Sequence, residues 1–385
     1  MVSSVKIGIG GDFCPQGANL PATTHGEPGS LFGDVLHHFQ AADISILNLE
    51  CPLVDAATPA PKAGPTLGVP TACSSVLASS GVRAVGLANN HLMDHGQPGL
   101  DSTLRALQAA GIQYFGAGSS LEEAGRILIV ERRGLRLGLL AMAEHEFGVA
   151  TRRTPGVNPL DLMGFVRSVR AQKNEYDHLI VLLHGGNEHA QYPRPSLVET
   201  CRFLVDEGAS AVLCQHSHCV GCYENYHGGH IVYGQGNLLF DMGGQSADWY
   251  SGLFVELDVQ RDGTIGAHLI PFRQSRPEVG IHRMSDTDEA QFLADLQQRS
   301  EMLRDPDRLD AEWDNYCRKH QVAYLRRLGT HNKLLRGLDR LTGYARWLYG
   351  NETTRLSHLN LLRCESHREA LVTILSNPVS RKGPQ

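Results

Sequence analysis

The chain has 385 residues, of which 42% are hydrophobic and 20% are charged. This composition excludes an intrinsically disordered protein and provides enough apolar residues for two ordinary domains or one large α/β domain. The formal net charge is −6 and no basic run stands out, so binding to nucleic acid is not expected. The chain also contains 19 histidines, and their positions must show whether they bind metal.

The N-terminal residues lack the apolar segment and the small-residue cleavage site of a secretory signal peptide. No segment approaches the roughly 18 apolar residues of a transmembrane helix, so we expect no membrane anchor. The nine cysteines are irregularly spaced, which is not typical of a disulfide framework. These features predict a cytoplasmic protein with reduced thiols. Cys219 and Cys222 have the CxxC spacing, but without a second pair they do not predict a structural zinc site.

Short apolar segments rich in β-branched residues recur along the chain, and each ends in a polar or glycine-rich turn. These predicted strands are residues 5–10, 44–49, 84–88, 137–141, 178–183, 211–214 and 230–233. Amphipathic helical patterns lie between them, for example at 99–110 and 195–207. Strands that alternate with helices indicate a layered α/β fold. Residues 58–70, rich in proline, alanine and glycine, predict an irregular surface loop.

The pattern changes after residue 250. Residues 253–259 and 265–270 alternate in polarity around a turn, which predicts a β-hairpin. From Ser285, a candidate N-cap, the pattern becomes helical. We therefore predict one domain at 1–280 and a C-terminal helical extension at 281–385. Apolar residues from Trp313 to Leu348 recur at helical spacing, and we expect them to pack on the main body, unless they form a lid or an interface of a homo-oligomer.

Metal-binding residue types follow several predicted strands at their carboxyl ends. They are Asp12; Asn48 and Glu50; Asn90, His91 and Asp94; His184 and Glu188; and His216 and His218. In open α/β sheets, ligands bind beyond the carboxyl ends of the strands, so we expect these side chains to converge. Each also has an ordinary explanation, such as a helix cap or a buried imidazole. Together they indicate a metal site, and carboxylate, amide and imidazole ligands suit Mn, Zn or Fe.

The order of these motifs resembles the calcineurin-like metallophosphoesterase superfamily, and in detail the CapA family associated with capsule and poly-γ-glutamate synthesis. The matching segments are Gly11-Asp12, Asn48-Leu-Glu50, Ala88-Asn-Asn-His91-Leu-Met-Asp94-His-Gly96, His184-Gly-Gly-Asn-Glu188, His216-Ser-His218 and Gly234-Gln-Gly-Asn237. The resemblance covers about residues 5–272. It implies a layered α/β/β/α sandwich of the metallophosphoesterase type, to which the C-terminal helical extension is added.

The resemblance also implies two divalent metal ions that share Glu50. One ion would bind Asp12, Glu50 and His218, and the other would bind Glu50, Asn90, His184 and His216. A hydroxide bridging the ions would attack the substrate. His91 would act as general acid or transition-state stabiliser, and Asp94 would orient its ring.

Three further residues are candidates for substrate binding. Glu188 and Asn237 match family positions that line the cleft. Arg194 is a candidate partner for an anionic substrate, although it could equally be an ordinary surface arginine. The chain departs from the superfamily pattern at Cys14, where a histidine is usual, and at Glu50, where an aspartate is usual. Cys14 could coordinate as a thiolate, and the site could hold a single metal ion instead of two.

The leading hypothesis is a metal-dependent hydrolase that acts on a phosphoester of a small or medium-sized anionic substrate. Hydrolysis of a γ-glutamyl or other amide bond is a second hypothesis, because metal-activated water serves both reactions. The chain could also be a component of poly-γ-glutamate-type biosynthesis, or a non-catalytic metal-binding partner in a polymer-synthesis assembly.

Overall fold

Two β-sheets form the centre of the computed structural model, which describes residues 4–25, 27–328 and 350–376. The eight-stranded sheet has the order β16 (Ile281–Arg283), β15 (Ile265–Gln274), β14 (Ser251–Val259), β1 (Val5–Phe13), β2 (Ile44–Leu49), β3 (Ala84–Gly86) and β4 (Gln113–Phe115), with β13 (Asn237–Leu239) paired to the end of β1. The six-stranded sheet has the order β11 (Tyr223–Tyr226), β12 (Gly229–Val232), β10 (Ala211–Gln215), β9 (His178–His184), β7 (Leu135–Ala143) and β6 (Leu128–Arg132). A small sheet pairs β5 (Ala117–Gly118) with β8 (Gly156–Val157).

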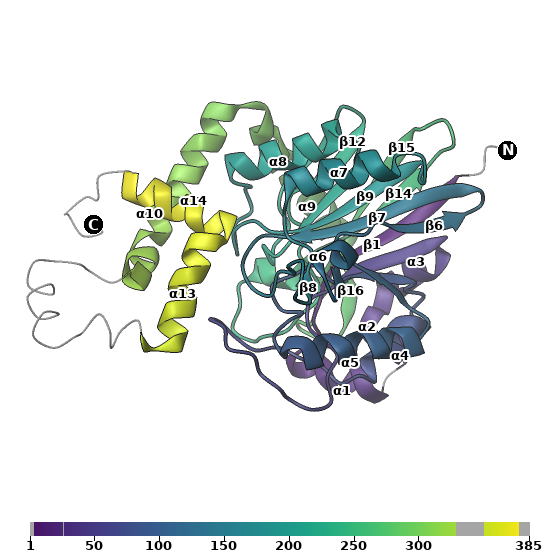
Figure 1. The fold of residues 1–385 in the computed structure, drawn as a ribbon. Helices are drawn as coiled ribbons and strands as arrows, with labels where there is room; N and C mark the ends of the chain where they lie inside the picture. Colours follow the sequence, from purple (N-terminus) through teal and green to yellow (C-terminus); the bar gives the residue numbers. More distant parts are fainter. Residues whose placement is uncertain (1–3, 26, 329–349, 377–385) are drawn as a thin grey trace, which may run out of the picture.

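Helices cover the outer faces of both sheets (Figure 1). On the six-stranded sheet lie α7 (Leu162–Gln172) and α8 (Pro195–Asp206). On the eight-stranded side lie α1 (Leu20–His25), α2 (Pro28–Phe32), α3 (Leu36–Ala41), α4 (Cys73–Ser79) and α5 (Gly96–Ala109). The body also contains α6 (Leu121–Ala124) and the 3₁₀ turns η1 (Gly17–Asn19), η2 (Gly33–Val35) and η3 (Ala247–Tyr250), and η4 (Glu301–Arg304) lies in the extension between its first two helices. The predicted α/β/β/α sandwich is confirmed.

Side-chain alternation explains the layers. Neighbouring residues of a strand point to opposite faces of the sheet. Leu139 of β7 and Ile180 of β9 accordingly belong to the core between the sheets, together with Ile46 of β2. Leu140 and Val181, one position further along, belong to a second core beneath α7 and α8. Because these strands are buried on both faces, they appear in the sequence as continuous apolar segments.

The strand, helix and hairpin predictions agree with these elements, apart from shifts of a few residues at their ends. The predicted loop at residues 58–70 contains no helix, but it is not wholly on the surface. Leu67 and Val69 are buried, and Val69 forms a β-bridge with Leu53. Part of this loop therefore packs into the body beside the carboxyl ends of the strands.

The C-terminal extension contains α9 (Asp286–Ser300), α10 (Pro306–Leu328), α13 (Glu352–Arg363) and α14 (Glu365–Ser376). Ser285 caps α9, as predicted, by accepting a hydrogen bond from the backbone N–H of Asp288 at 3.1 Å. Strand β16 and Leu296 of α9 pack with the body, whereas α10, α13 and α14 share a separate apolar core. The division at residue 280 stays a prediction, and the apolar residues predicted at 329–348 lie outside the described residues.

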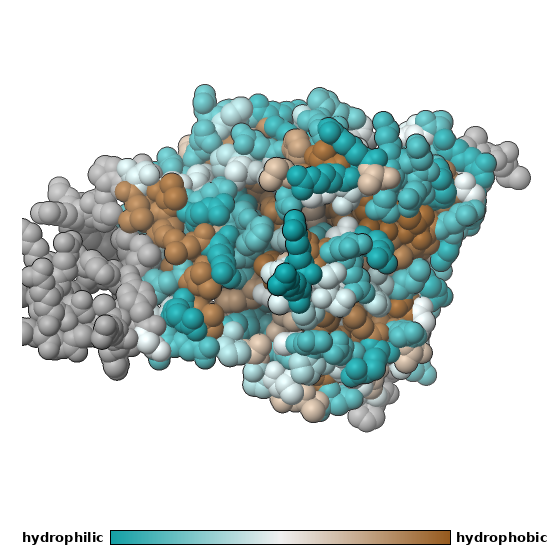
Figure 2. Space-filling model, viewed as in Figure 1, coloured by the Kyte–Doolittle hydropathy of each residue, from teal (hydrophilic) through white to brown (hydrophobic). Residues whose placement is uncertain are grey.

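The surface of the extension carries exposed apolar side chains. Leu362, Val372 and Leu375 are each more than half exposed. Figure 2 shows apolar surface on this part of the molecule. That the extension forms the interface of a homo-oligomer stays a prediction.

The nine cysteines are all buried and free. Burial raises the pKa of Cys219 and that of Cys222 to about 12, so both thiols of the CxxC pair are protonated. Within the ranges that the structure describes, no helix combines the length and apolar character needed to span a membrane.

Gly11 lies where β1 meets β13, and its lack of a side chain is required there. A Cβ at this position would lie 2.2 Å from the carbonyl oxygen of Gly236. We expect Gly11→Ala to lower the free energy of unfolding by about 1–3 kcal/mol, because the backbone must move to relieve the clash. Chemical denaturation measures this change. The control is Gly29→Ala in α2, where a Cβ meets open space; equal stability of the two variants would contradict the argument.

Candidate metal centre

The candidate metal-binding residues meet because parallel strands end at the same edge of each sheet. Strand β1 is parallel to β2, and their register places Asp12 opposite Asn48. Glu50 follows β2 directly, and Asn90 follows β3. In the second sheet β9 is parallel to β10, and His184 lies opposite Gln215, which precedes His216. The carboxyl ends of the parallel strands in both sheets thus place the predicted residues close together, at the candidate metal centre.

The turn after β10 has a strained backbone. His216 has φ of 91° and His218 has φ of 54°, a region that costs residues other than glycine about 1–3 kcal/mol. The backbone N–H of His216 donates to Asp12 Oδ2 at 3.0 Å, which ties this turn to the first sheet. The turn keeps this unfavourable backbone conformation, which places the imidazoles of His216 and His218 at the candidate metal centre.

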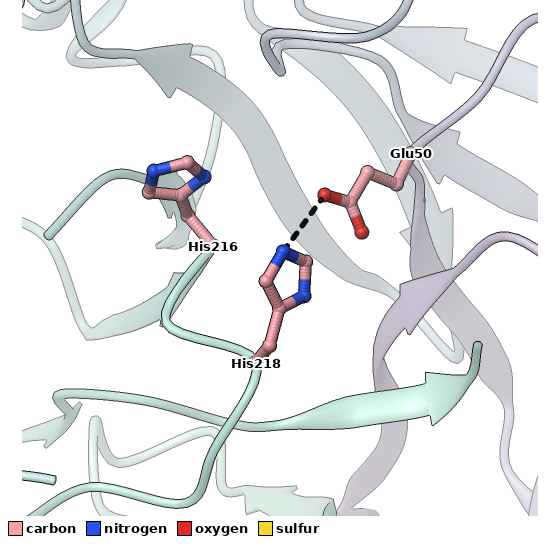
Figure 3. Close-up of side chains that lie close together, drawn as sticks. All are labelled: Glu50, His216 and His218. Carbon is pink, nitrogen blue, oxygen red and sulfur yellow. Dashed lines mark ion pairs between the residues drawn. The ribbon is translucent and has the colours of Figure 1, made fainter. Parts of the chain in front are cut away.

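Glu50 lies in the middle of the arrangement. Its Oε1 is 3.8 Å from His184 Nε2 and 3.7 Å from His218 Nε2. Figure 3 shows the Glu50 and His218 side chains pointing toward one another, with His216 on the same turn as His218. Among the described residues, two groups of potential ligands have donor atoms within 4.8 Å of one another: Glu50, His216 and His218, and Asp12, Glu50 and His184. Glu50 belongs to both.

These groups divide the ligands differently from the family pattern. The pattern assigns His218 to the ion that binds Asp12, whereas the compact groups place His184 with Asp12 and His218 with His216. His218 Nδ1 is nevertheless 3.7 Å from Asp12 Oδ2, so His218 lies close to both carboxylates. Asn90 is close to His184, because its Oδ1 is 3.0 Å from His184 Nε2.

Neighbouring amides set the orientation of the imidazoles. His218 Nδ1 lies 2.9 Å from Asn237 Oδ1, and Asn237 Nδ2 donates to the carbonyl oxygen of Trp249 at 3.0 Å. Since an amide oxygen only accepts, His218 donates from Nδ1 and presents the lone pair of Nε2 toward Glu50. The structure thus places Asn237 behind a candidate metal ligand, while the predicted contact of Asn237 with substrate stays untested.

Electrostatics favour a cation at this centre. Burial raises the pKa of Asp12 to about 6, and burial together with the charge of Asp12 raises the pKa of Glu50 well above its ordinary range. Burial lowers the pKa of His218 to about 3 and that of His184 well below 6.5, so both rings are neutral and can offer lone pairs. A divalent cation would offset the desolvation of both carboxylates.

The hydrogen bonds of Glu50 provide a test of whether a metal fits. Both of its carboxylate oxygens are buried, and neither accepts a hydrogen bond from any described residue. Buried carboxylates are ordinarily paired, hydrogen-bonded or bound to metal. The residues present therefore fit a divalent ion. Cys14 is a poor ligand by comparison, because burial raises the pKa of its thiol well above the ordinary value.

His91 and Asp94 form a buried pair beside the centre. His91 Nδ1 donates to Asp94 Oδ2 at 2.7 Å, which leaves Nε2 as the other reactive position of the ring. Lys62, from the 58–70 loop, forms a buried ion pair with Asp94 Oδ1. The backbone N–H of Leu67 also donates to Asp94, at 2.7 Å. Sequence reasoning missed Lys62 because nothing local marks a loop residue for contact with a distant pair.

A cavity of about 370 Å³ opens onto the centre. Asn90, His91, His218 and Glu188 line it, and the contact of Glu188 with a substrate stays a prediction. Glu146 also lines the cavity, although no motif in the sequence marks it. Its Oε2 lies 3.9 Å from His216 Nε2.

Arg194 lies outside the residues that line this cavity in the described part of the chain. It is 3% exposed, and its guanidinium donates to Glu144 at 2.8 Å and to Glu369 of α14 at 3.2 Å. This placement differs from the predicted contact with an anionic substrate. Arg194 instead connects the body to the extension.

This chain is a two-sheet α/β protein with a candidate metal centre at the carboxyl ends of its strands. Residues 6–242 match the family model described as bacterial capsule synthesis protein PGA_cap. Because this match covers more than half of the chain, the protein belongs to that family.

Two curated relatives illustrate the similarity. The capsule biosynthesis protein CapA of Bacillus anthracis is 29% identical over 170 residues, which cover 43% of this chain and 41% of the relative. A probable polyglutamine synthesis accessory protein of Mycobacterium tuberculosis (strain CDC 1551 / Oshkosh) is 33% identical over 221 residues, which cover 52% of this chain and 58% of the relative. The chain thus spans less than two thirds of the length of each.

Among solved structures, the 5'-nucleotidase from Candida albicans SC5314 is similar, with a TM-score of 0.43 and 12% sequence identity. The similarity covers 81% of this chain and 57% of that chain.

Removal of the Glu50 charge tests the centre directly. We expect Glu50→Gln to abolish stoichiometric binding of Mn²⁺ or Zn²⁺, because Glu50 belongs to both ligand groups. Elemental analysis after dialysis against each metal measures the loss, and Glu122→Gln, an exposed position on α6, is the matched control. Wild-type metal content in Glu50→Gln would show that Glu50 is not a ligand.

The pair between His145 and Glu365 of α14 makes docking of the extension depend on pH. The carboxylate of Glu365 accepts hydrogen bonds from His145 Nδ1 at 2.7 Å and from the His145 backbone N–H at 2.9 Å. The contact with Glu365 raises the pKa of His145 above 6.5, although burial and Arg368 oppose the shift and Asp161 supports it. The stabilisation is therefore complete below pH 6.5 and is lost as the pH rises through the raised pKa.

We expect His145→Gln to destabilise the protein more at pH 5.5 than at pH 9. Denaturant titrations at both pH values measure the difference, with His268→Gln, an exposed histidine of β15, as control. A loss of stability that is equal at the two pH values would rule out an ionic contribution from His145.

Proposed function

We propose that this protein is a metal-dependent hydrolase that cleaves a phosphoester of a small or medium-sized anionic substrate. The observation that carries the proposal is the buried Glu50 carboxylate, which belongs to two potential ligand groups and accepts no hydrogen bond from the described residues. The His91–Asp94 pair beside it supports catalysis over simple metal binding, because a binding site needs no proton donor.

In this proposal six residues would hold two divalent ions, Mn, Zn or Fe: Asp12, Glu50, Asn90, His184, His216 and His218. Bound ions would supply Lewis-acid stabilisation of developing negative charge and would lower the pKa of a water molecule. Asp12 also fixes the backbone of the His216 turn, and Asn237 fixes the ring of His218. These contacts hold the ligands in place before any ion binds.

His91 would transfer a proton to the leaving group from Nε2. Asp94 accepts the hydrogen bond from Nδ1 and therefore holds the ring in one orientation. The ammonium of Lys62 balances the charge of the buried Asp94 carboxylate. Glu188 lies at the cavity wall, where it would contact the substrate or an attacking water molecule.

Cleavage of a γ-glutamyl or other amide bond is the second candidate activity. Its support is the naming of the relatives, one as a capsule biosynthesis protein and the other as a probable accessory protein of polyglutamine synthesis. The same metal chemistry would polarise an amide carbonyl. A non-catalytic role in a polymer-synthesis assembly is the candidate from a different functional class. The cytoplasmic location stays a prediction.

Substitution of His91 tests its role as general acid, and the panel of substrates tests which function the protein has. We expect His91→Ala to lower kcat about 10²–10⁴-fold on the best phosphomonoester, phosphodiester or γ-glutamyl amide, because the general acid is removed. Metal content should be unchanged. Steady-state assays with Mn²⁺-loaded protein measure the rates, and His268→Ala is the matched control.

Full activity in His91→Ala would refute the assigned role of this residue. If the metal-loaded wild type turns over none of the three substrate classes, the binding hypothesis is favoured over the hydrolase.

A further inference from the structure

The C-terminal extension forms part of the wall of the cavity over the metal centre. Ser357 and Asn360 of α13 and His367 of α14 line the same cavity as His91 and His218. The match to the family model ends at residue 242, so these residues lie outside it. A wall built from residues beyond the shared region is a place where the specificity of this chain can differ from that of its relatives.

Three consecutive residues after β7 hold this wall in place. Glu144 Oε2 accepts a hydrogen bond from the backbone N–H of Ser366 at 3.0 Å, at the beginning of α14, where a negative charge stabilises the helix. His145 binds Glu365 of the same helix. Glu146 Oε1 accepts a hydrogen bond from Asn360 Nδ2 at 3.2 Å and lies 3.8 Å from His367 Nε2. The extension is therefore attached at the cavity itself.

Asn360 carries an acceptor that no described residue uses. The residue is 8% exposed, and its Oδ1 is buried without a hydrogen-bond partner among the described residues. The contact of Nδ2 with the Glu146 carboxylate fixes the orientation of the amide, because a carboxylate can only accept. The orientation of the Asn360 amide is thus fixed, and its unpaired buried oxygen is costly unless a ligand supplies a donor.

Neighbouring groups at the wall favour the same kind of ligand. Glu146 and Glu188 both line the cavity with carboxylates, which accept hydrogen bonds and do not donate them. The Lys62 ammonium, which could serve a ligand acceptor, already pairs with Asp94. Glu146, Glu188 and Asn360 thus give the cavity several hydrogen-bond acceptors.

We propose that the C-terminal extension recognises the part of the substrate beyond the scissile bond, and that Asn360 Oδ1 accepts a hydrogen bond from an N–H or O–H group there. This inference rests on the proposed hydrolase function, since it assumes that the substrate reaches the metal centre through this cavity. It narrows the substrate to a molecule that carries a hydrogen-bond donor a few atoms from the bond that is cleaved.

Matched ligands test the inference. The probes are ω-hydroxyalkyl phosphates with two to four carbons, each paired with the alkyl phosphate that has the same number of heavy atoms. Calorimetry with Mn²⁺-loaded, full-length protein gives the dissociation constants. We expect the hydroxyl compound to bind about tenfold more tightly at the chain length that reaches Asn360, because it satisfies a buried acceptor.

Asn360→Leu, which has a similar volume, should remove this preference and leave the affinity for the alkyl phosphates unchanged. Asn360→Met is a second variant, and amide hydrogen exchange of α13 shows whether the helix is still docked in each. Arg363→Ala, at an exposed position of α13, is the control and should keep the preference.

Two outcomes would overturn the inference: no preference for the hydroxyl compound at any length in the wild type, or an undiminished preference in a docked Asn360→Leu variant. Release of phosphate from the same compounds tests the proposed function separately. Preference for the hydroxyl compound without hydrolysis would support the inference and contradict the phosphoesterase activity. Hydrolysis without this preference would support the phosphoesterase activity and contradict the inference.

Discussion

The burial of the Glu50 carboxylate among the imidazoles of His184, His216 and His218 is the constraint on which the rest of the centre depends. Desolvation penalises this charge, and the nearby Asp12 carboxylate increases the penalty. No described residue donates a hydrogen bond to this carboxylate, so hydrogen bonding does not offset the penalty. The surrounding structure accordingly concentrates groups that can hold a cation, and the turn at His216 and His218 retains two left-handed residues to do so.

A second set of buried charges connects the body to the C-terminal extension. Burial raises the pKa of Glu144, but the Arg194 guanidinium and the Ser366 N–H prevail and lower it to about 2. Glu144 is therefore ionised across the physiological range, and it joins Arg194, the residue before α8, to the first turn of α14. The next two residues, His145 and Glu146, also contact the extension. The short segment from Glu144 to Glu146 thus lies between the candidate metal centre and the helical extension.

The residues 58–70 show where local sequence reasoning fails. Their composition predicts a surface loop, and the absence of helix agrees with that prediction. Yet Lys62 reaches Asp94 and His91, and Leu67 is buried. Proline and glycine content reports backbone conformation, but it carries no information on which distant side chain a loop will meet. Arg194 is a similar case, because its neighbour Glu369 is 175 residues away.

The layered α/β architecture and the polar residues at the carboxyl ends of the strands could be predicted from the amino-acid sequence. Apolar periodicity and polar residues at strand ends are local properties, and parallel strands bring their carboxyl ends to the same edge of a sheet. Three features became apparent in the three-dimensional structure: which histidines lie nearest to which carboxylate, the orientation of His218 by Asn237, and the position of Asn360 and His367 at the cavity. These outcomes depend on the packing of segments that are far apart in the chain, as in the contact between Asn360 and Glu146, which are 214 residues apart. Such contacts are set by three-dimensional packing and leave no signal in the local sequence pattern.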